Sequence, residues 1–190
     1  MLYAGSVGKV NNLGHLVETA KALWEADEEP AILVVGKGQE WESIREHAER
    51  LGVLGRNFFM SGPVPKKAMP DLYSRCTLAL SWFLPKKEME KNSSNKFFDG
   101  LASGTPVAIN YGGWMKELLE DNEAGIAVDG VDPQRTAMQL LEALRDADRL
   151  ESMGRNARRL AEEQFGRDES ADVLEDVLVR VATKEETGVR

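Results

Sequence analysis

Residues 92–107 read NSSNKFFDGLASGTPV, and this stretch holds in order the signals for a loop, a helix, a turn and a strand. Its polar start predicts a loop that enters a helix at Ser94 or Asn95. Gly104 ends that helix, and Pro106 opens the next strand. Large apolar residues inside the helix would hold it on a sheet, namely Phe97, Phe98 and Leu101. A helix that returns directly to a strand is the repeating unit of an α/β fold.

The same alternation extends over the rest of the chain. Short apolar runs predict strands at 2–4, 31–35, 57–61, 77–82, 105–110 and 125–128. Helical signals predict a first helix capped by Asn12. They also predict helices at 41–51, 66–76, 94–103 and 114–120, and two or three more between Asp132 and Val181. Residues 83–95 are expected to form a polar loop.

Uninterrupted apolar strands that alternate with helices are typical of parallel sheets covered on both faces. We therefore expect an α/β fold, with a Rossmann-like doubly wound parallel sheet of about six strands. Residues 1–182 should form one domain, and residues 183–190 a charged, frayed tail.

The composition argues against several classes of protein. The formal net charge is −8, whereas a nucleic-acid partner requires a basic surface. The one cysteine, Cys76, excludes an intrachain disulfide framework, and no apolar stretch approaches the length of a membrane span. No acidic cluster accompanies His15 or His47, so we expect no metal site, and we expect His15 on the surface of its helix.

Ligands of doubly wound sheets bind at the carboxyl ends of the strands, near the point where strand order reverses. This rule selects the loops at 5–12, 36–40, 62–67, 83–96 and 110–117. The first combines Gly5 and Gly8 with Lys9 before a helix, which favours an anion site, and a plain turn is the alternative. It is not a Walker A loop, because no Gly-Lys-Ser/Thr ending is present.

Gly36 begins a Gly-Lys-Gly turn that partly matches a dinucleotide fingerprint. Trp41 stands where the third glycine is required, and the turn follows the second strand instead of the first. NAD is therefore disfavoured. The turn is expected either to be a plain turn or to line one side of a nucleotide pocket.

The start of the helix at 94–103 carries the strongest chemical signal. Its amides, the side chains of Ser94 and Asn95, and Lys96 are placed to face an anion such as a diphosphate. Asp99 follows one turn later, where its carboxylate is placed to accept hydrogen bonds from a ribose. The alternative is that Asp99 only stabilises the helix dipole.

Residues 95–107 resemble the signature helix of the retaining group 1 (family 4) glycosyltransferases, which ends in Ala-x-Gly-x-Pro-Val. The Asn-Lys before an aromatic residue and an acid is similar to the branch that builds bacterial surface polysaccharides, including N-acetylfucosamine transferases. Further blocks follow in the family's order: residues 3–9, 33–38 and 59–64, Gly112-Gly113 with Glu117, Met153-Gly154 with Ala157-Arg158, and Phe165.

The resemblance implies a role for each residue of the motifs. Lys9 and Lys96 would balance the diphosphate of the donor and serve catalysis, and Gly8 would allow a close backbone approach. The remaining donor-binding residues would be Gly5 and Gly36 in the loops, Ser94 and Asn95 at the diphosphate, Asp99 at the ribose, and Val64 at the base.

The resemblance also implies a reaction and its partners. The chain would be half of a GT-B enzyme that transfers a sugar from a nucleotide-sugar, with UDP as the expected nucleotide, and with retention and no metal. A glycan or lipid-linked acceptor would bind an N-terminal domain that this chain lacks, so the chain alone should be inactive. The whole enzyme would be cytoplasmic, at most peripheral at the inner membrane.

The sequence departs from the family pattern at two places. Many members carry an acid eight positions before the helix acid, whereas Lys91 stands here and Glu90 is one place away. Asn11 and Asn12 stand where the first loop usually has a basic residue. A UDP-sugar epimerase half and a non-catalytic nucleotide-binding pseudo-transferase therefore remain alternatives. A receiver-like interaction domain is disfavoured, because its acidic residues are absent.

Overall fold

The computed structural model describes residues 1–28 and 30–186. Six parallel strands form one sheet in the order β3-β2-β1-β4-β5-β6. Their bounds are β1 Leu2–Ser6, β2 Ile32–Lys37, β3 Phe58–Ser61, β4 Ala79–Ser81, β5 Val107–Ile109 and β6 Gly125–Ala127. This arrangement confirms the predicted Rossmann-like doubly wound sheet.

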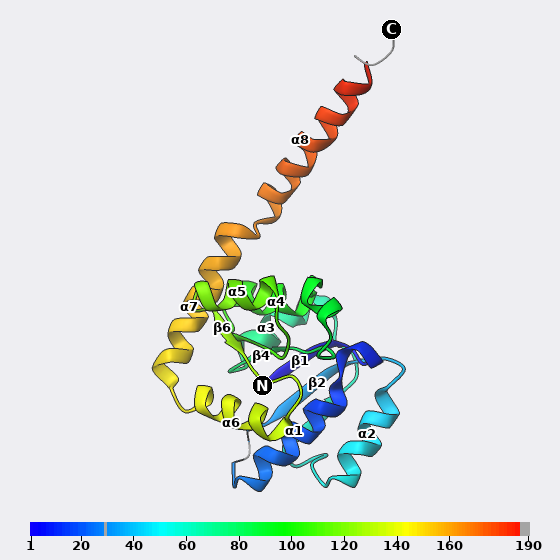
Figure 1. Cartoon of the computed structure of the whole chain (residues 1–190), viewed down its shortest axis with the longest axis vertical. Coiled ribbons are helices and arrows are strands. Elements are labelled where there is room, and N and C mark those ends of the chain that lie inside the picture. Colours follow the sequence, from blue (N-terminus) through cyan, green and yellow to red (C-terminus); the bar gives the residue numbers. More distant parts are fainter. Residues whose placement is uncertain (29, 187–190) are drawn as a thin grey trace.

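The helices lie in two layers on the two faces of the sheet (Figure 1). One layer contains α1 (Leu13–Glu25), α2 (Trp41–Arg50) and α6 (Pro133–Leu144). The other contains α3 (Met69–Ser74), α4 (Asn95–Ala102), α5 (Trp114–Asp121) and α7 (Ala147–Gln164). Short 3-10 helices occupy three of the connections: η1 (Lys9–Asn11), η2 (Lys66–Ala68) and η3 (Lys87–Lys91).

Alternation along the strands divides the core between these layers. In β1, Tyr3 points into the cluster that contains α1, whereas Leu2 and Ala4 belong to the cluster that contains α4. Leu78 and Leu80 likewise join the first cluster, and Ala79 between them joins the second. A strand buried on both faces needs apolar residues at every position, which explains the continuous apolar runs of the sequence.

The order of the strands reverses between β1 and β4. The five register pairs of β1 with β2 run from Leu2 to Ser6, whereas the described pairing of β1 with β4 is Leu2 with Ala79. The chain leaves β1 toward α1 on one face and leaves β4 toward α4 on the other. The carboxyl ends of β1 and β4 therefore border the crevice in which ligands of such sheets bind.

Three local expectations need correction. Asn12 precedes α1 but adopts a left-handed conformation, with φ of 48°, and its side chain does not cap the helix. Residues 83–95 are not purely loop, because η3 lies within them. His15 is not on the surface: it is only 7% exposed, and Trp82 Nε1 donates to its Nδ1 at 3.2 Å. Packing of α1 on the sheet beside Trp82, which directly follows β4, provides both the burial and the partner.

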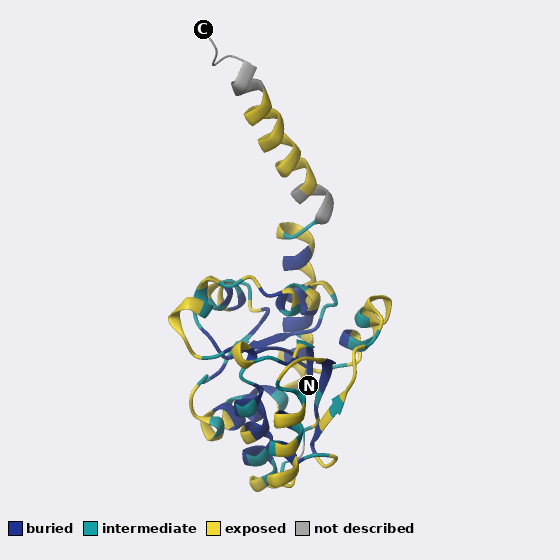
Figure 2. Ribbon diagram, turned by 90° about the vertical axis from the view of Figure 1, so that its right-hand side faces the viewer, coloured by how far each residue is buried: buried dark blue, intermediate teal, exposed yellow. Residues whose placement is uncertain are grey.

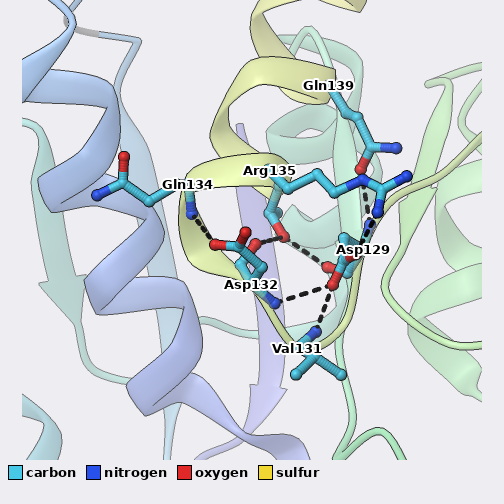
Figure 3. Close-up of polar contacts among 7 residues, drawn as sticks. Asp129, Val131, Asp132, Gln134, Arg135 and Gln139 are labelled. Carbon is cyan, nitrogen blue, oxygen red and sulfur yellow. Dashed lines mark hydrogen bonds and ion pairs between the residues drawn. The ribbon is translucent and has the colours of Figure 1, made fainter.

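The predicted helix start at Asp132 and Pro133 is confirmed (Figure 3). The Asp132 carboxylate accepts a hydrogen bond from the amide of Gln134 at 2.9 Å, which satisfies an otherwise unpaired donor at the start of α6. Asp129 closes the preceding turn by accepting from the amides of Val131 and Asp132. This hydrogen-bonded turn joins β6 to α6.

The last helix, α8 (Arg167–Glu186), extends away from the body of the molecule (Figure 1). Its side chains from 171 to 182 are exposed (Figure 2). It continues to Glu186, four residues into the segment expected to fray, and residues 187–190 lie outside the described residues. Within the described part of the chain, no helix combines the length and the apolarity needed to cross a membrane.

The close approach of β1 and β2 leads to a stability prediction. Gly36 has φ of +154°, and a Cβ atom added to it would lie 1.9 Å from the carbonyl oxygen of Gly5. We expect Gly36→Ala to lower the free energy of unfolding by roughly 2–3 kcal/mol, because the two strand ends must separate. Thermal denaturation followed by circular dichroism should show a melting temperature lower by about 4–12 °C.

Gly62→Ala is the matched control, because a Cβ atom at Gly62 would meet no atom within 4 Å. Its melting temperature should stay within a degree or two of the wild-type value, as is usual for unstrained surface positions. An equal loss of stability in both variants would show that the contact between Gly36 and Gly5 does not limit the packing of the strands.

Candidate functional site

A cavity of about 810 Å³ lies at the carboxyl edge of the sheet, beside the start of α4. Its wall comes from the ends of β1 and β2, from the loops after β3 and β4, and from the first turns of α4. It contains Ala4, Gly5, Ser6, Val35, Gly36, Lys37, Pro63, Val64, Lys66, Met69, Phe83, Asn92, Ser93, Ser94, Asn95, Lys96, Phe98 and Asp99. Segments far apart in the sequence thus meet at the edge that the strand rule selected.

Seven of the nine predicted site residues line this cavity. They are Gly5, Gly36, Val64, Ser94, Asn95, Lys96 and Asp99. The structure does not bring Gly8 and Lys9 to the same wall: Lys9 is exposed in η1, and Gly8 precedes it. The roles of Gly8 and Lys9 stay predictions.

Lys96 is the most perturbed charge of the cavity. Its ammonium lies 5.2 Å from the ring centre of Tyr3 and 5.0 Å from that of Phe83. Burial lowers the pKa of Lys96 to about 8, although the nearby Asp99 acts in the opposite direction. Among the described residues, no carboxylate forms an ion pair with it. A largely buried cation held by ring faces alone is poised to accept an anionic partner.

The stem of Lys96 lies against the backbone of β1. A Cβ atom added to Gly5 would come within 3.1 Å of Lys96 Cδ. A residue with a side chain at position 5 would therefore push the lysine away from the strand end. Gly5, near the end of β1, therefore leaves room for the stem of Lys96, although the two residues are more than ninety positions apart in the sequence.

The start of α4 presents free backbone donors. Ser94 occupies the N-cap position, but its side chain forms no capping hydrogen bond. The first intrahelical bond runs from the amide of Phe97 to the carbonyl of Ser94 at 3.0 Å, so helix geometry leaves the amides of Asn95 and Lys96 without an intrahelical acceptor. These amides and the helix dipole favour negative charge beside Lys96.

Asp99 lies one turn further along α4, on the cavity wall. Desolvation raises the pKa of its carboxyl, and the positive charges of Lys66 and Lys96 oppose that rise. Among the described residues, no lysine or arginine forms an ion pair with Asp99. The carboxylate is therefore available to accept hydrogen bonds from a ligand.

Lys37 and Lys66 also line the cavity, and neither was among the predicted site residues. Both lie in loops that the strand rule had selected, so position was the signal that could have identified them. With Lys96 they place three cations against one acid, Asp99, in a chain whose net charge is −8. The cavity is thus suited to a ligand with more than one negative charge.

Trp114 fixes the loop that leads into α4. Its indole nitrogen donates to the carbonyl of Asn92 at 3.0 Å, and its ring packs near those of Phe97 and Phe98. The loop after β4 is also tied to the first loop, because Leu84 donates its amide to the carbonyl of Val10 at 2.9 Å. The cavity wall is therefore held from two sides.

Neither Glu90 nor Lys91 belongs to the wall of this cavity. Glu90 lies against Gly112 and Gly113 and lines a second cavity of about 370 Å³ between η3 and the ends of β5 and β6. Neither position therefore brings an acid to the wall of the larger cavity.

Comparison with known proteins places this geometry in a family. The family model described as "Glycosyl transferases group 1" matches residues 1–160. Spore coat protein SA of Bacillus subtilis (strain 168) is 24% identical over 175 residues, covering 87% of this chain and 45% of that protein. The chain therefore spans less than half the length of this curated relative.

Solved structures share the fold at low identity. The pneumococcal O-GlcNAc transferase GtfA, in complex with UDP and GlcNAc, is similar with a TM-score of 0.77 and 17% identity, over 95% of this chain and 35% of that chain. The C-terminal domain of the group 1 family protein LpcC from Francisella tularensis is similar with a TM-score of 0.70 and 15% identity, over 87% of this chain and 86% of that chain. Since the family model covers most of the sequence, the chain belongs to the group 1 glycosyl transferase family.

Proposed function

We propose that this chain is the donor-binding half of a retaining glycosyltransferase that moves a sugar from a UDP-sugar to a glycan or lipid-linked acceptor. The observation that carries the proposal is the largely buried ammonium of Lys96. No carboxylate of the described residues pairs with it, and two helix amides without an intrahelical acceptor lie beside it. A diphosphate supplies the negative charge and the acceptor oxygens that such a site lacks. The family and the complexes of similar proteins with UDP support the choice of ligand.

The other walls fit the remaining parts of a nucleotide. Asp99 lies one turn from the anion site and accepts hydrogen bonds from the ribose hydroxyls. Val64 and its neighbour Pro63, in the loop after β3, line the same cavity and hold the base through backbone contacts. Gly36 keeps the wall between them free of side chains. The nucleotide then lies along the carboxyl ends of β1–β3, with its phosphates at α4.

Transfer requires that the leaving diphosphate be stabilised as the bond to the sugar breaks. Lys96 and the amides of Asn95 and Lys96 are in place before the reaction, which is the condition for electrostatic preorganisation. Lys37 and Lys66 add positive charge to the same cavity. Lys9, in η1, acts on the donor only if the opposite domain brings the phosphates toward the first loop.

A non-catalytic nucleotide-binding protein is the second candidate. The observation that favours it is the absence of Glu90 and Lys91 from the cavity wall. Many members of the family that the sequence resembles carry an acid near the donor sugar at this point. In that case UDP would bind, but the full-length protein would transfer no sugar. N-acetylfucosamine is the first donor sugar to examine, because the Asn-Lys motif resembles that branch.

The decisive experiment is calorimetric titration of the chain with UDP, GDP, ADP and NAD. We expect one nucleoside diphosphate to bind, with UDP as the best ligand. Lys96→Ala should weaken binding about 10- to 100-fold, because it removes a charge-assisted contact in a partly desolvated site. Asp99→Ala should weaken UDP about 5- to 20-fold and should affect a ligand without ribose, such as pyrophosphate, much less.

Lys21→Ala is the control for net charge. Lys21 pairs with Glu25 on α1, away from the cavity, so its removal should leave the affinity for UDP unchanged. Lys9→Ala distinguishes the role of Lys9 from that of Lys96. If Lys9 contacts the donor only when the opposite domain closes over it, the affinity of this variant for UDP should match the wild-type value. An unchanged affinity for UDP in Lys96→Ala would contradict the proposed anion site.

The pKa of Lys96 leads to a prediction about pH. With a pKa of about 8 in the free protein, Lys96 is protonated below that pH, and a bound diphosphate raises its pKa further. Affinity for UDP should therefore be nearly constant between about pH 7 and 8 and fall by up to roughly tenfold per unit above that. Titrations at a series of pH values measure this directly.

Lys96→Arg gives the matched comparison, because guanidinium remains charged throughout this range. The fall in affinity above pH 8 should disappear in this variant, even if its absolute affinity is lower. If Lys96→Arg keeps the full pH dependence of the wild-type chain, another group governs it and the assignment to Lys96 is wrong.

The half-enzyme proposal predicts a separation of binding from transfer. The isolated chain should bind UDP yet release no sugar from UDP-sugars to added glycan or lipid-linked acceptors, because the acceptor pocket belongs to the other half. The assay follows UDP release by chromatography with and without acceptor. Robust transfer by this chain alone would contradict the proposed division of labour between two domains.

A further inference from the structure

The start of α4 is open because the side chain of Ser94 is held away from it. A serine at the N-cap ordinarily accepts a hydrogen bond from an amide in the first turn of its own helix. Ser94 makes no such bond. Its Oγ instead accepts a hydrogen bond from Ser81 Oγ, at the end of β4, over 3.0 Å. The sheet therefore keeps the capping residue away from the amides that it would otherwise satisfy.

Ser81 is the middle member of a chain of three buried hydroxyls. Its Oγ lies 2.8 Å from Tyr111 Oη. Each hydroxyl has one hydrogen to donate, and Ser81 uses its hydrogen on Ser94. The phenol of Tyr111 has two acceptors within reach: Ser81 Oγ at 2.8 Å and the Met115 thioether sulfur at 3.5 Å. Because a thioether is a weak acceptor, the hydrogen of Tyr111 goes to Ser81. Burial raises the pKa of Tyr111 to about 12, so the phenol retains the hydrogen that this direction requires.

All three members are shielded from water. The exposed fractions are 0% for Ser81, 4% for Ser94 and 6% for Tyr111. Hydrogen bonds in such surroundings are stronger than in water and polarise one another along a chain. A hydroxyl that accepts a bond from a neighbour becomes a better donor in its turn. Because Tyr111 donates to Ser81 and Ser81 donates to Ser94, the hydroxyl of Ser94 becomes a stronger hydrogen-bond donor.

The hydrogen of the Ser94 hydroxyl is unused in the part of the chain that the structure describes. Within residues 1–28 and 30–186, no acceptor receives it. Ser94 lines the large cavity, next to the free amides of Asn95 and Lys96. A nearly fully buried hydroxyl whose hydrogen is unused, at the wall of a cation-lined cavity, is aimed at an acceptor that the ligand must supply.

We propose that Ser81 and Tyr111 are positioning residues of the anion site, which hold Ser94 Oγ off the helix amides and direct its hydrogen to a phosphate oxygen of a nucleoside diphosphate. This inference rests on the proposed function and adds two residues that do not touch the ligand. Both lie outside the 92–107 stretch, on β4 and in the loop after β5. Their effect reaches the ligand only through Ser94.

A purely structural network would behave differently in two measurable respects. Loss of a buried hydroxyl that serves only stability would lower the affinity for all ligands equally, or would leave every affinity unchanged. Its effect on binding would also be independent of whether Ser94 carries a hydroxyl. The positioning role instead requires that the effect depend on the phosphates of the ligand and vanish when Ser94 Oγ is removed.

The experiment is a double-mutant cycle read by titration with UDP and with uridine, which lacks the phosphates. Ser81→Ala should weaken UDP about 5- to 20-fold and leave uridine unchanged. Tyr111→Phe should weaken UDP about 2- to 5-fold, because Ser81 can still donate to Ser94. In a Ser94→Ala background, neither substitution should weaken UDP further.

Thr19→Val is the matched control for loss of a buried hydroxyl. Thr19 Oγ1 donates to the carbonyl of His15 within α1, far in the chain from the cavity wall, and its removal should not change the affinity for UDP. Near-ultraviolet circular dichroism of each variant checks that it is folded. If Ser81→Ala does not fold, the cycle of Tyr111→Phe with Ser94→Ala decides the same question.

Each outcome has one meaning. The positioning role is overturned if the losses of affinity for UDP are additive in the double variants. It is also overturned if a variant loses affinity for UDP and for uridine to the same extent. An unchanged affinity of Ser81→Ala for UDP also overturns the positioning role. If Lys96→Ala weakens the binding of UDP in the same experiments, the proposed function is still supported. A wild-type chain that binds no nucleoside diphosphate overturns the proposed function and this inference together.

Discussion

The reversal of strand order between β1 and β4 is the constraint on which the site depends. Right-handed crossovers send the chain to opposite faces on the two sides of this point, so no helix covers the strand ends there. Lys96 of α4 then lies at the crevice, near the rings of Tyr3 from β1 and of Phe83 after β4. The cavity is a consequence of topology before any particular side chain gives it chemistry.

The site is electrostatically opposite to the molecule around it. A chain with a net charge of −8 concentrates Lys37, Lys66 and Lys96 at one cavity and opposes them with Asp99. Burial makes the charge of Lys96 costly, which is why its pKa falls to about 8. Ring faces and an open helix start compensate only in part. An anion of the right shape would remove the remaining cost, which links stability of the site to its occupancy.

Several residues at and beside the start of α4 lack interactions that would stabilise the helix. Ser94 does not cap its helix, Lys96 has no ion pair among the described residues, and Gly5 gives up a side chain so that the lysine can lie against β1. Each would be a defect in a helix whose only task was packing. Together they leave donors and charge free in one direction. Functional sites commonly show this exchange of local stability for prepared geometry.

The sequence by itself determined the elements, their order and most of the cavity wall, because periodicity and glycine positions are local properties that the chain displays directly. The α/β class and the cluster around Ser94, Asn95, Lys96 and Asp99 could be read in this way. Tertiary structure alone decided what depends on contacts between distant segments. Those include the exclusion of Lys9 from the cavity wall, the burial of His15 against Trp82, and the bond that draws Ser94 toward Ser81. No spacing rule predicts these contacts, because each partner is chosen by the packing of a helix on the sheet and not by its neighbours in sequence.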